Sequence, residues 1–149
     1  MPRLRLPAFA AAFSLLFLLA ACGGMEQTAQ GPINLKASLS GAQENPPVAS
    51  AGTGTGTMTY DPASKRLTWS LTWSNLSGPA GAAHFHGPAA PGANAGVVVP
   101  IGGAGMTSPV SGQATLTDAQ AADLLAGRWY MNIHTAANAG GEIRGQVTR

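Results

Sequence analysis

The strictest pattern in the 149-residue chain is the alternation of residues 65–76, KRLTWSLTWSNL. Leu67, Trp69, Leu71 and Trp73 occupy every second position, and threonine and serine fill the positions between them. Successive side chains of a strand point to opposite faces, so this run predicts a strand with one buried and one polar face. We interpret both tryptophans as anchors of the core, because large aromatic side chains dominate core packing.

Similar short runs recur along the chain, separated by turns rich in glycine and proline. They predict strands in the segments NLKASLSG, GTGTGTMTYDP, AAHFHG, VVVPI, SGQATL, RWYMNIHT and EIRGQV. One helix is predicted at about 118–126, where Thr117 and Gln120 can form a capping box and Gly127 supplies the stop. The sequence therefore predicts a single all-β domain, an antiparallel β-sandwich or flattened barrel with one short helix.

Residues 1–21 have the layout of an export signal. Arg3 and Arg5 precede an apolar run that extends through Leu19 and is short for a transmembrane helix. The segment LLAAC that follows resembles the bacterial lipobox, and this resemblance implies that Cys22 is lipidated. An ordinary signal peptide, with Cys22 incidental, is the alternative.

Lipidation of Cys22 would place the domain on a membrane surface without a spanning helix. Residues 22–33 would then form a flexible tether, and residues 34–149 the folded domain. We expect an exported, lipid-anchored protein, on the outer membrane or the periplasmic face if the organism has two membranes. Because Cys22 is the only cysteine, no disulfide is expected.

The charge balance changes when the export signal is removed. Residues 1–21 contain two of the eight basic residues and no acidic ones, so six basic and six acidic residues remain and their formal charge is zero. A neutral domain with scattered cations lacks the basic patch that binds nucleic acid, so we expect no nucleic-acid partner. A protein partner at the cell surface is left open.

The three histidines of the chain form the candidate metal site. His84 and His86 are two residues apart in one predicted strand and so share a face, and His134 lies on the polar face of another. If these strands are neighbours, three imidazoles meet on the outer face under the loop of residues 87–105, a set that suits copper or zinc. The alternative is that they are ordinary solvent-facing histidines that never meet.

Four motifs in order resemble the chordin-type (CHRD) domain: LSGAQENPPV, AAHFHGPAAPGANAGVVVPI, LTDAQAADLLAGRWYMNIHT and GEIRGQV. The resemblance runs from about Leu35 to Val147. It implies a β-sandwich or immunoglobulin-like barrel outside the cytoplasm, and little biochemistry. The family's His-x-His motif matches His84 and His86, and its Asn-x-His-Thr motif matches Asn132 to Thr135, although Phe85 stands where an aliphatic residue is more usual.

A weaker likeness is to Cu/Zn superoxide dismutase, a β-sandwich enzyme that also has a histidine pair on a strand. The chain has only three histidines, so dismutase activity is not expected. Glu142 and Arg144 are interpreted as a surface pair. We expect a membrane-anchored, non-enzymatic binding or structural module with no catalytic residues. The alternative is a periplasmic copper- or zinc-binding protein that uses His84, His86 and His134.

Overall fold

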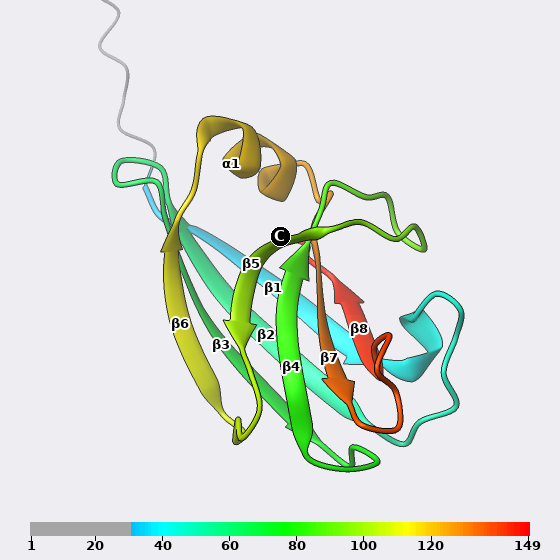
Figure 1. Ribbon diagram of the computed structural model, residues 1–149. Coiled ribbons are helices and arrows are strands. Elements are labelled where there is room, and N and C mark those ends of the chain that lie inside the picture. The colour runs from blue at the N-terminus through cyan, green and yellow to red at the C-terminus, as the bar shows by residue number, and fades with distance from the viewer. Residues whose placement is uncertain (1–30) are drawn as a thin grey trace, which may run out of the picture.

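The computed structural model describes residues 31–149, and these residues form eight strands and two short helices (Figure 1). The strands are β1 (Ile33–Ser40), β2 (Thr53–Asp61), β3 (Arg66–Ser74), β4 (Ala80–His86), β5 (Val97–Gly102), β6 (Val110–Thr115), β7 (Tyr130–Thr135) and β8 (Ile143–Gln146). The helices are the 3-10 helix η1 (Gly41–Gln43) and the α-helix α1 (Asp118–Leu125). The export signal, Cys22 and nearly all of the tether lie outside the described residues.

All strands belong to one antiparallel sheet in the order β5-β4-β7-β8-β1-β2-β3-β6. The sheet folds back on itself, so that β5, β4, β7 and β8 form one layer and β1, β2, β3 and β6 the other (Figure 1). The two edge strands, β5 and β6, contact each other and nearly close the sheet into a barrel. The predicted all-β sandwich or barrel with one short helix is confirmed.

The core lies between the two layers and is built from the alternating residues of each strand. Trp69 of β3 packs edge-on against Phe85 of β4, with ring centroids 5.2 Å apart, and Phe85 also contacts Trp129. The interpretation of Trp73 as a second core anchor is only partly right, because Trp73 is half-buried. The ladder between β3 and β6 ends at Leu71, so no neighbouring strand covers Trp73 on that side.

The VVVPI run is a short buried strand by its sequence, but the corresponding strand β5 is only partly buried. Only Val99 and Ile101 are buried, whereas Val97 is 52% exposed. The reason is that β5 is an edge strand that pairs with β4 alone in the sheet. Pro100 is tolerated there because an edge position does not require its missing N–H.

Helix α1 covers one end of the barrel and begins where the sequence predicts (Figure 1). The Thr117 side chain accepts from the Gln120 backbone N–H, and the Gln120 side chain accepts from the Thr117 N–H. Gly127 follows the helix with a φ of 70°, a conformation that favours glycine. Leu124 is buried beneath the helix. No helix in residues 31–149 has both the length and the apolar character needed to cross a bilayer.

Candidate metal centre

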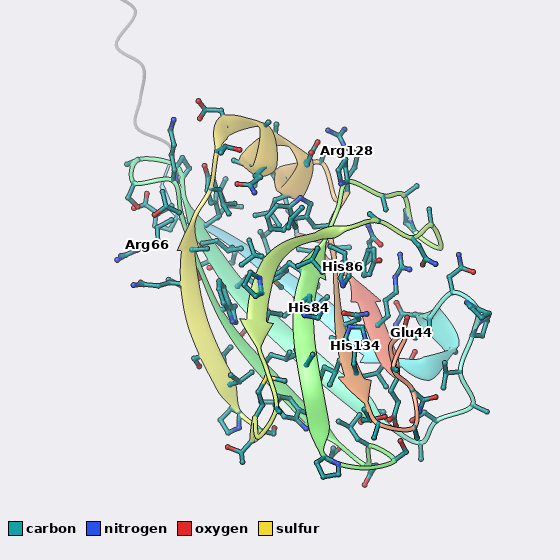
Figure 2. The ribbon with its side chains drawn as sticks, in the orientation of Figure 1. Glu44, Arg66, His84, His86, Arg128 and His134 are labelled. Atoms are coloured by element: carbon teal, nitrogen blue, oxygen red, sulfur yellow. The ribbon has the colours of Figure 1, made fainter. Side chains whose placement is uncertain are left out.

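The three histidines meet on one face of the neighbouring strands β4 and β7 (Figure 2). The antiparallel register places Ala82 opposite His134 and His84 opposite Asn132. His84 Nδ1 lies 3.2 Å from His134 Nε2. One ring nitrogen from each of His84, His86 and His134 lies within 4.8 Å of the other two. The three histidines therefore converge, which the spacing in the sequence left open.

Two backbone carbonyls determine which ring nitrogen is protonated in two of the histidines. His86 Nδ1 lies 2.9 Å from the carbonyl oxygen of Ala95, and His134 Nδ1 lies 3.0 Å from that of Ala139. A carbonyl oxygen can only accept, so each Nδ1 carries a hydrogen. In the neutral form of each ring, Nε2 is then an unprotonated nitrogen that faces the interior of the cluster.

Asn132 lies between these two imidazoles. The position assigned to its Oδ1 is 3.0 Å from both His86 Nε2 and His134 Nε2. The oxygen and nitrogen of a side-chain amide are told apart by their hydrogen-bond partners, and two unprotonated nitrogens require a donor. The amide nitrogen therefore belongs at this position in the neutral cluster, where it donates one hydrogen to each ring. Asn132 thus holds the unprotonated Nε2 atoms of His86 and His134 close together.

Burial favours the neutral form of two of the rings. It lowers the pKa of His84, and the neighbouring His134 and His86 lower it further. Burial also lowers the pKa of His134, although the hydrogen bond to the Ala139 carbonyl partly opposes this effect. A neutral imidazole is the form that binds a metal ion, so these two rings need not lose a proton near pH 7 before binding one.

A cleft of about 520 Å³ gives access to the cluster from one side. His84 and His134 line it together with small residues, among them Ala82, Ala104 and Ala139. His86 does not line this cleft and is only 9% exposed. A ligand that enters the cleft would therefore meet His84 and His134 first.

The outer face of β7 is covered at Tyr130 and Asn132, whereas His134 is partly exposed to the cleft. The Ala95 N–H donates to the Tyr130 hydroxyl at 3.2 Å, which places the loop after β4 over this strand. The Tyr130 ring stacks on His86, with centroids 4.7 Å apart and planes 2° from parallel. Arg144 of β8 places its guanidinium carbon 3.4 Å from the centre of the Tyr130 ring. Because β7 lies between β4 and β8, Tyr130 is the middle member of a His86–Tyr130–Arg144 stack.

The interpretation of Glu142 and Arg144 as a surface pair is wrong, since their exposed fractions are 0% and 2%. β8 is an inner strand, and the loop after β4 covers Arg144. Arg144 donates to the Asn94 side chain and to the Ala93 carbonyl. It is therefore a buried anchor for that loop and not a solvated surface cation.

Glu142 accepts four hydrogen bonds from other parts of the chain. Its donors are the Ser50 hydroxyl at 2.7 Å, the Ser77 N–H at 2.7 Å, the Ser77 hydroxyl at 2.5 Å and the Thr135 hydroxyl at 2.6 Å. Burial alone would raise the pKa of Glu142, but these hydrogen bonds lower it to about 2. Since Thr135 follows His134 and Ser77 precedes β4, the Glu142 carboxylate ties together the two strands that carry the histidines.

Sequence reasoning assigned no role to Glu44 or to Tyr130. For Tyr130 a signal existed, because it shares the polar side of its strand with Asn132 and His134. Glu44 follows η1 in a proline-rich turn without periodicity, so nothing in the pattern indicated that it is buried.

Comparison with protein families agrees with this architecture. The family model described as CHRD domain matches residues 35–147, which include nearly all of the sheet and the three histidines. No match was found among the curated proteins or the solved structures. On the extent of the family match, the chain belongs to the CHRD-domain family.

Proposed function

We propose that this protein is an exported, lipid-anchored CHRD-domain protein that acts as a non-enzymatic binding module, and that its histidine cluster binds one copper or zinc ion. The observation that carries the proposal is the approach of three imidazole nitrogens to within 4.8 Å of one another. They come from His84, His86 and His134.

The spacing of the nitrogens is close to that of a three-histidine site. A metal–nitrogen bond of ~2.0–2.1 Å and a tetrahedral angle require the nitrogens to lie roughly 3.3 Å apart. His84 Nδ1 and His134 Nε2 are already 3.2 Å apart. Small rotations of the rings, with Asn132 moving out from between His86 and His134, would bring the third nitrogen to the same spacing.

The surroundings of the rings also suit a metal site. Histidines that bind metals usually donate their other ring N–H to a carbonyl or carboxylate, which fixes the tautomer. The Ala95 and Ala139 carbonyls accept such bonds from His86 and His134. Imidazole ligands suit zinc and copper, and a given site generally binds Cu²⁺ more tightly than Zn²⁺. We therefore expect copper to compete successfully with zinc.

Three protein ligands leave a fourth position for water or an external ligand. That position would be reached from the cleft lined by His84 and His134. Apart from the two histidines, the cleft is lined by alanine, glycine, Pro79 and Thr135, so residues 31–149 place no carboxylate or amine there. Binding or transfer of the ion therefore fits this site better than catalysis.

The membrane anchor rests on the sequence. The LLAAC segment and the lone Cys22 support lipidation, and a Cys22→Ser variant tests it. We expect the parent protein in the membrane fraction and the variant outside it. The same distribution for both would contradict the anchor.

The metal is tested on exported protein that is purified without a chelator and without a metal-affinity tag. Copper and zinc are measured by mass spectrometry in the parent, in a His84→Ala/His86→Ala variant and in a Gln113→Ala control. Gln113 is exposed on β6, away from the cluster. We expect about one ion per chain in the parent and control, and none in the double variant. A metal-free parent that takes up neither ion on titration at neutral pH would refute the site.

A further inference from the structure

A second pocket, of about 350 Å³, lies where η1 and the loop after β4 meet strand β8. Strand β8 separates this pocket from the histidines on β4 and β7. Its lining residues include Gln43, Glu44, Asn45, Arg144 and Gln146. Figure 2 labels Glu44 on this side of the sheet, apart from the three histidines. None of the three histidines lines this pocket, so any ligand here would bind outside the candidate metal centre.

Glu44 is the unusual residue in this pocket. It is only 8% exposed, and its Oε1 is buried without a hydrogen-bond partner among residues 31–149. The backbone makes room for the carboxyl group at Gly141, where a Cβ atom would lie 2.5 Å from Oε1. A buried carboxyl oxygen without a partner is costly, and native structures rarely keep one without a reason.

Three side-chain amides in the same pocket donate to other parts of the protein and leave their oxygens free, although Asn45 uses only one of its two Nδ2 hydrogens. Gln43 donates its Nε2 hydrogens to the Ser38 carbonyl and the Ser40 hydroxyl, and Asn45 donates Nδ2 to the Gly92 carbonyl. Because carbonyl oxygens only accept, these bonds fix the orientation of both amides. Neither amide oxygen receives a hydrogen bond within the described part of the chain.

Gln146 likewise donates through its amide nitrogen and leaves its amide oxygen free. Its Nε2 donates to the carbonyls of Ala89 and Gly127, and its Oε1 accepts no hydrogen bond from residues 31–149. Together with Glu44, four residues of the lining have a side-chain oxygen that accepts no hydrogen bond from residues 31–149. The Glu44 Oε1 atom is buried against Gly141 and must turn to meet a ligand in the pocket. Such a surface is suited to a ligand that donates several hydrogen bonds.

Arg144 is the cation in the pocket lining, and two of its five N–H groups donate to other residues of the protein. Its two terminal nitrogens bond to Asn94 and Ala93, and its face lies on Tyr130. It forms no ion pair with Glu44 within the described residues. Arg144 is held by the loop after β4 and by the Tyr130 ring, and it leaves the Glu44 carboxylate without a paired cation among the described residues.

From this arrangement we propose that the pocket binds a primary ammonium group, held by the Glu44 carboxylate and the free amide oxygens of Gln43, Asn45 and Gln146. An ammonium carries three donors and one positive charge, which match an acceptor-rich pocket with one carboxylate. The group can belong to a free amine or to the amino end of a small zwitterion, and the pocket volume accommodates either.

The ionisation of Glu44 makes this binding dependent on pH. Burial raises the pKa of Glu44 to about 7, and the positive charge of Arg144 only partly opposes the shift. Among the charged groups in the described residues, Arg144 is the one that faces Glu44 from the opposite wall, whereas Glu142 bonds to Ser50, Ser77 and Thr135 instead. For a carboxyl group with that pKa, the ionised fraction increases roughly tenfold from pH 6 to pH 8.

The test is a titration of the isotopically labelled protein, followed by backbone amide chemical shifts. n-Butylammonium is the probe, 1-butanol is its neutral counterpart, butyrate is the anion, and glycine represents the zwitterion. The parent is compared with Glu44→Gln and with Asp118→Asn, which removes an equal charge from an exposed position on α1. The titrations are repeated in the His84→Ala/His86→Ala variant, so that the outcome is independent of any metal.

We expect saturable shifts around Glu44, Asn45 and Gln146 with n-butylammonium. Affinity should be about tenfold weaker for 1-butanol, which is a neutral donor, and in Glu44→Gln, which offers a neutral acceptor. Each change replaces a hydrogen bond between two charged groups by one in which a partner is neutral. Asp118→Asn should bind as the parent does. Glycine binding as tightly as n-butylammonium would identify a zwitterion as the source of the ammonium group. The proposal would be overturned if 1-butanol binds equally well, if butyrate binds better, or if no shift is saturable. It would also be overturned if a folded Glu44→Gln variant keeps the affinity of the parent.

Discussion

Replacing Glu142 with glutamine is expected to destabilise the protein in a manner that depends on pH. The carboxylate is fully buried and accepts hydrogen bonds from Ser50, Ser77 and Thr135 at 2.5–2.7 Å. Glutamine keeps the shape but presents one neutral carbonyl acceptor and an NH2 group with two donor hydrogens. The serine and threonine hydroxyls can rotate to accept from the new amide, so the fold should survive.

The magnitude follows from the change in hydrogen-bond strength. A hydrogen bond to a charged group contributes about 1.5–3 kcal/mol and a neutral one about 0.5–1.5 kcal/mol, and removal of the buried charge recovers part of the difference. The pKa of Glu142 agrees in direction, since it is lowered from 4.5 to about 2. After allowance for solvent screening, we expect Glu142→Gln to lose about 2–3 kcal/mol of unfolding free energy at pH 7.

The sign of the pH dependence is fixed by the same pKa. A depressed pKa in the folded state gives a contribution that is present above pH 4.5 and is lost as the pH falls towards 2. Urea unfolding of parent and variant at pH 7 and pH 3, followed by tryptophan fluorescence, measures this difference. We expect the gap between them to shrink to about 1 kcal/mol at pH 3. A gap that is negligible at pH 7, or equal at both pH values, would refute the reasoning.

Three further outcomes are expected. Glu44→Gln should have the opposite effect to Glu142→Gln. Because the pKa of Glu44 is raised, the parent loses stability as the pH rises from 4.5 to about 7. Urea unfolding at pH 8 should therefore show the variant more stable by about 2 kcal/mol, with no gain near pH 4. Zinc affinity, measured by competition with a coloured chelator, should change little from pH 8 to 6.5 and fall at lower pH, because the pKa values of His84 and His134 are lowered from 6.5. Arg144→Lys should lose about 3 kcal/mol in urea unfolding, because lysine cannot replace both the planar stacking and the two hydrogen bonds.

The sequence was sufficient to predict the strands because their inward faces alternate. Leu67, Trp69 and Leu71 are buried as the period of two requires, and the capping box of Thr117 with Gln120 marks the start of α1. The same periodicity placed the three histidines on the correct face of their strands. It could not establish that β4 and β7 are neighbours, because strand order depends on contacts between distant segments.

Periodicity was a poor guide to the outward faces. It separates one side of a strand from the other, but it does not say what else covers the outer side. Here the loop after β4 lies over Tyr130 and Arg144, and polar side chains that would be solvated on an open sheet become buried. The burial of Glu44 and Glu142 has the same origin, since loop segments enclose both carboxyl groups.

The pairing of β4 with β7 has a consequence for folding. His84 and His134 are 50 positions apart along the chain, and two strands, β5 and β6, and helix α1 lie between their strands. Their nitrogens therefore come together only after a long-range strand pair has formed, and an unfolded chain offers no such set of ligands. A metal ion that occupies the cluster would bind the native state selectively, so ion concentration and melting temperature would be thermodynamically linked. The supply of the ion would then also control how much of the domain stays folded.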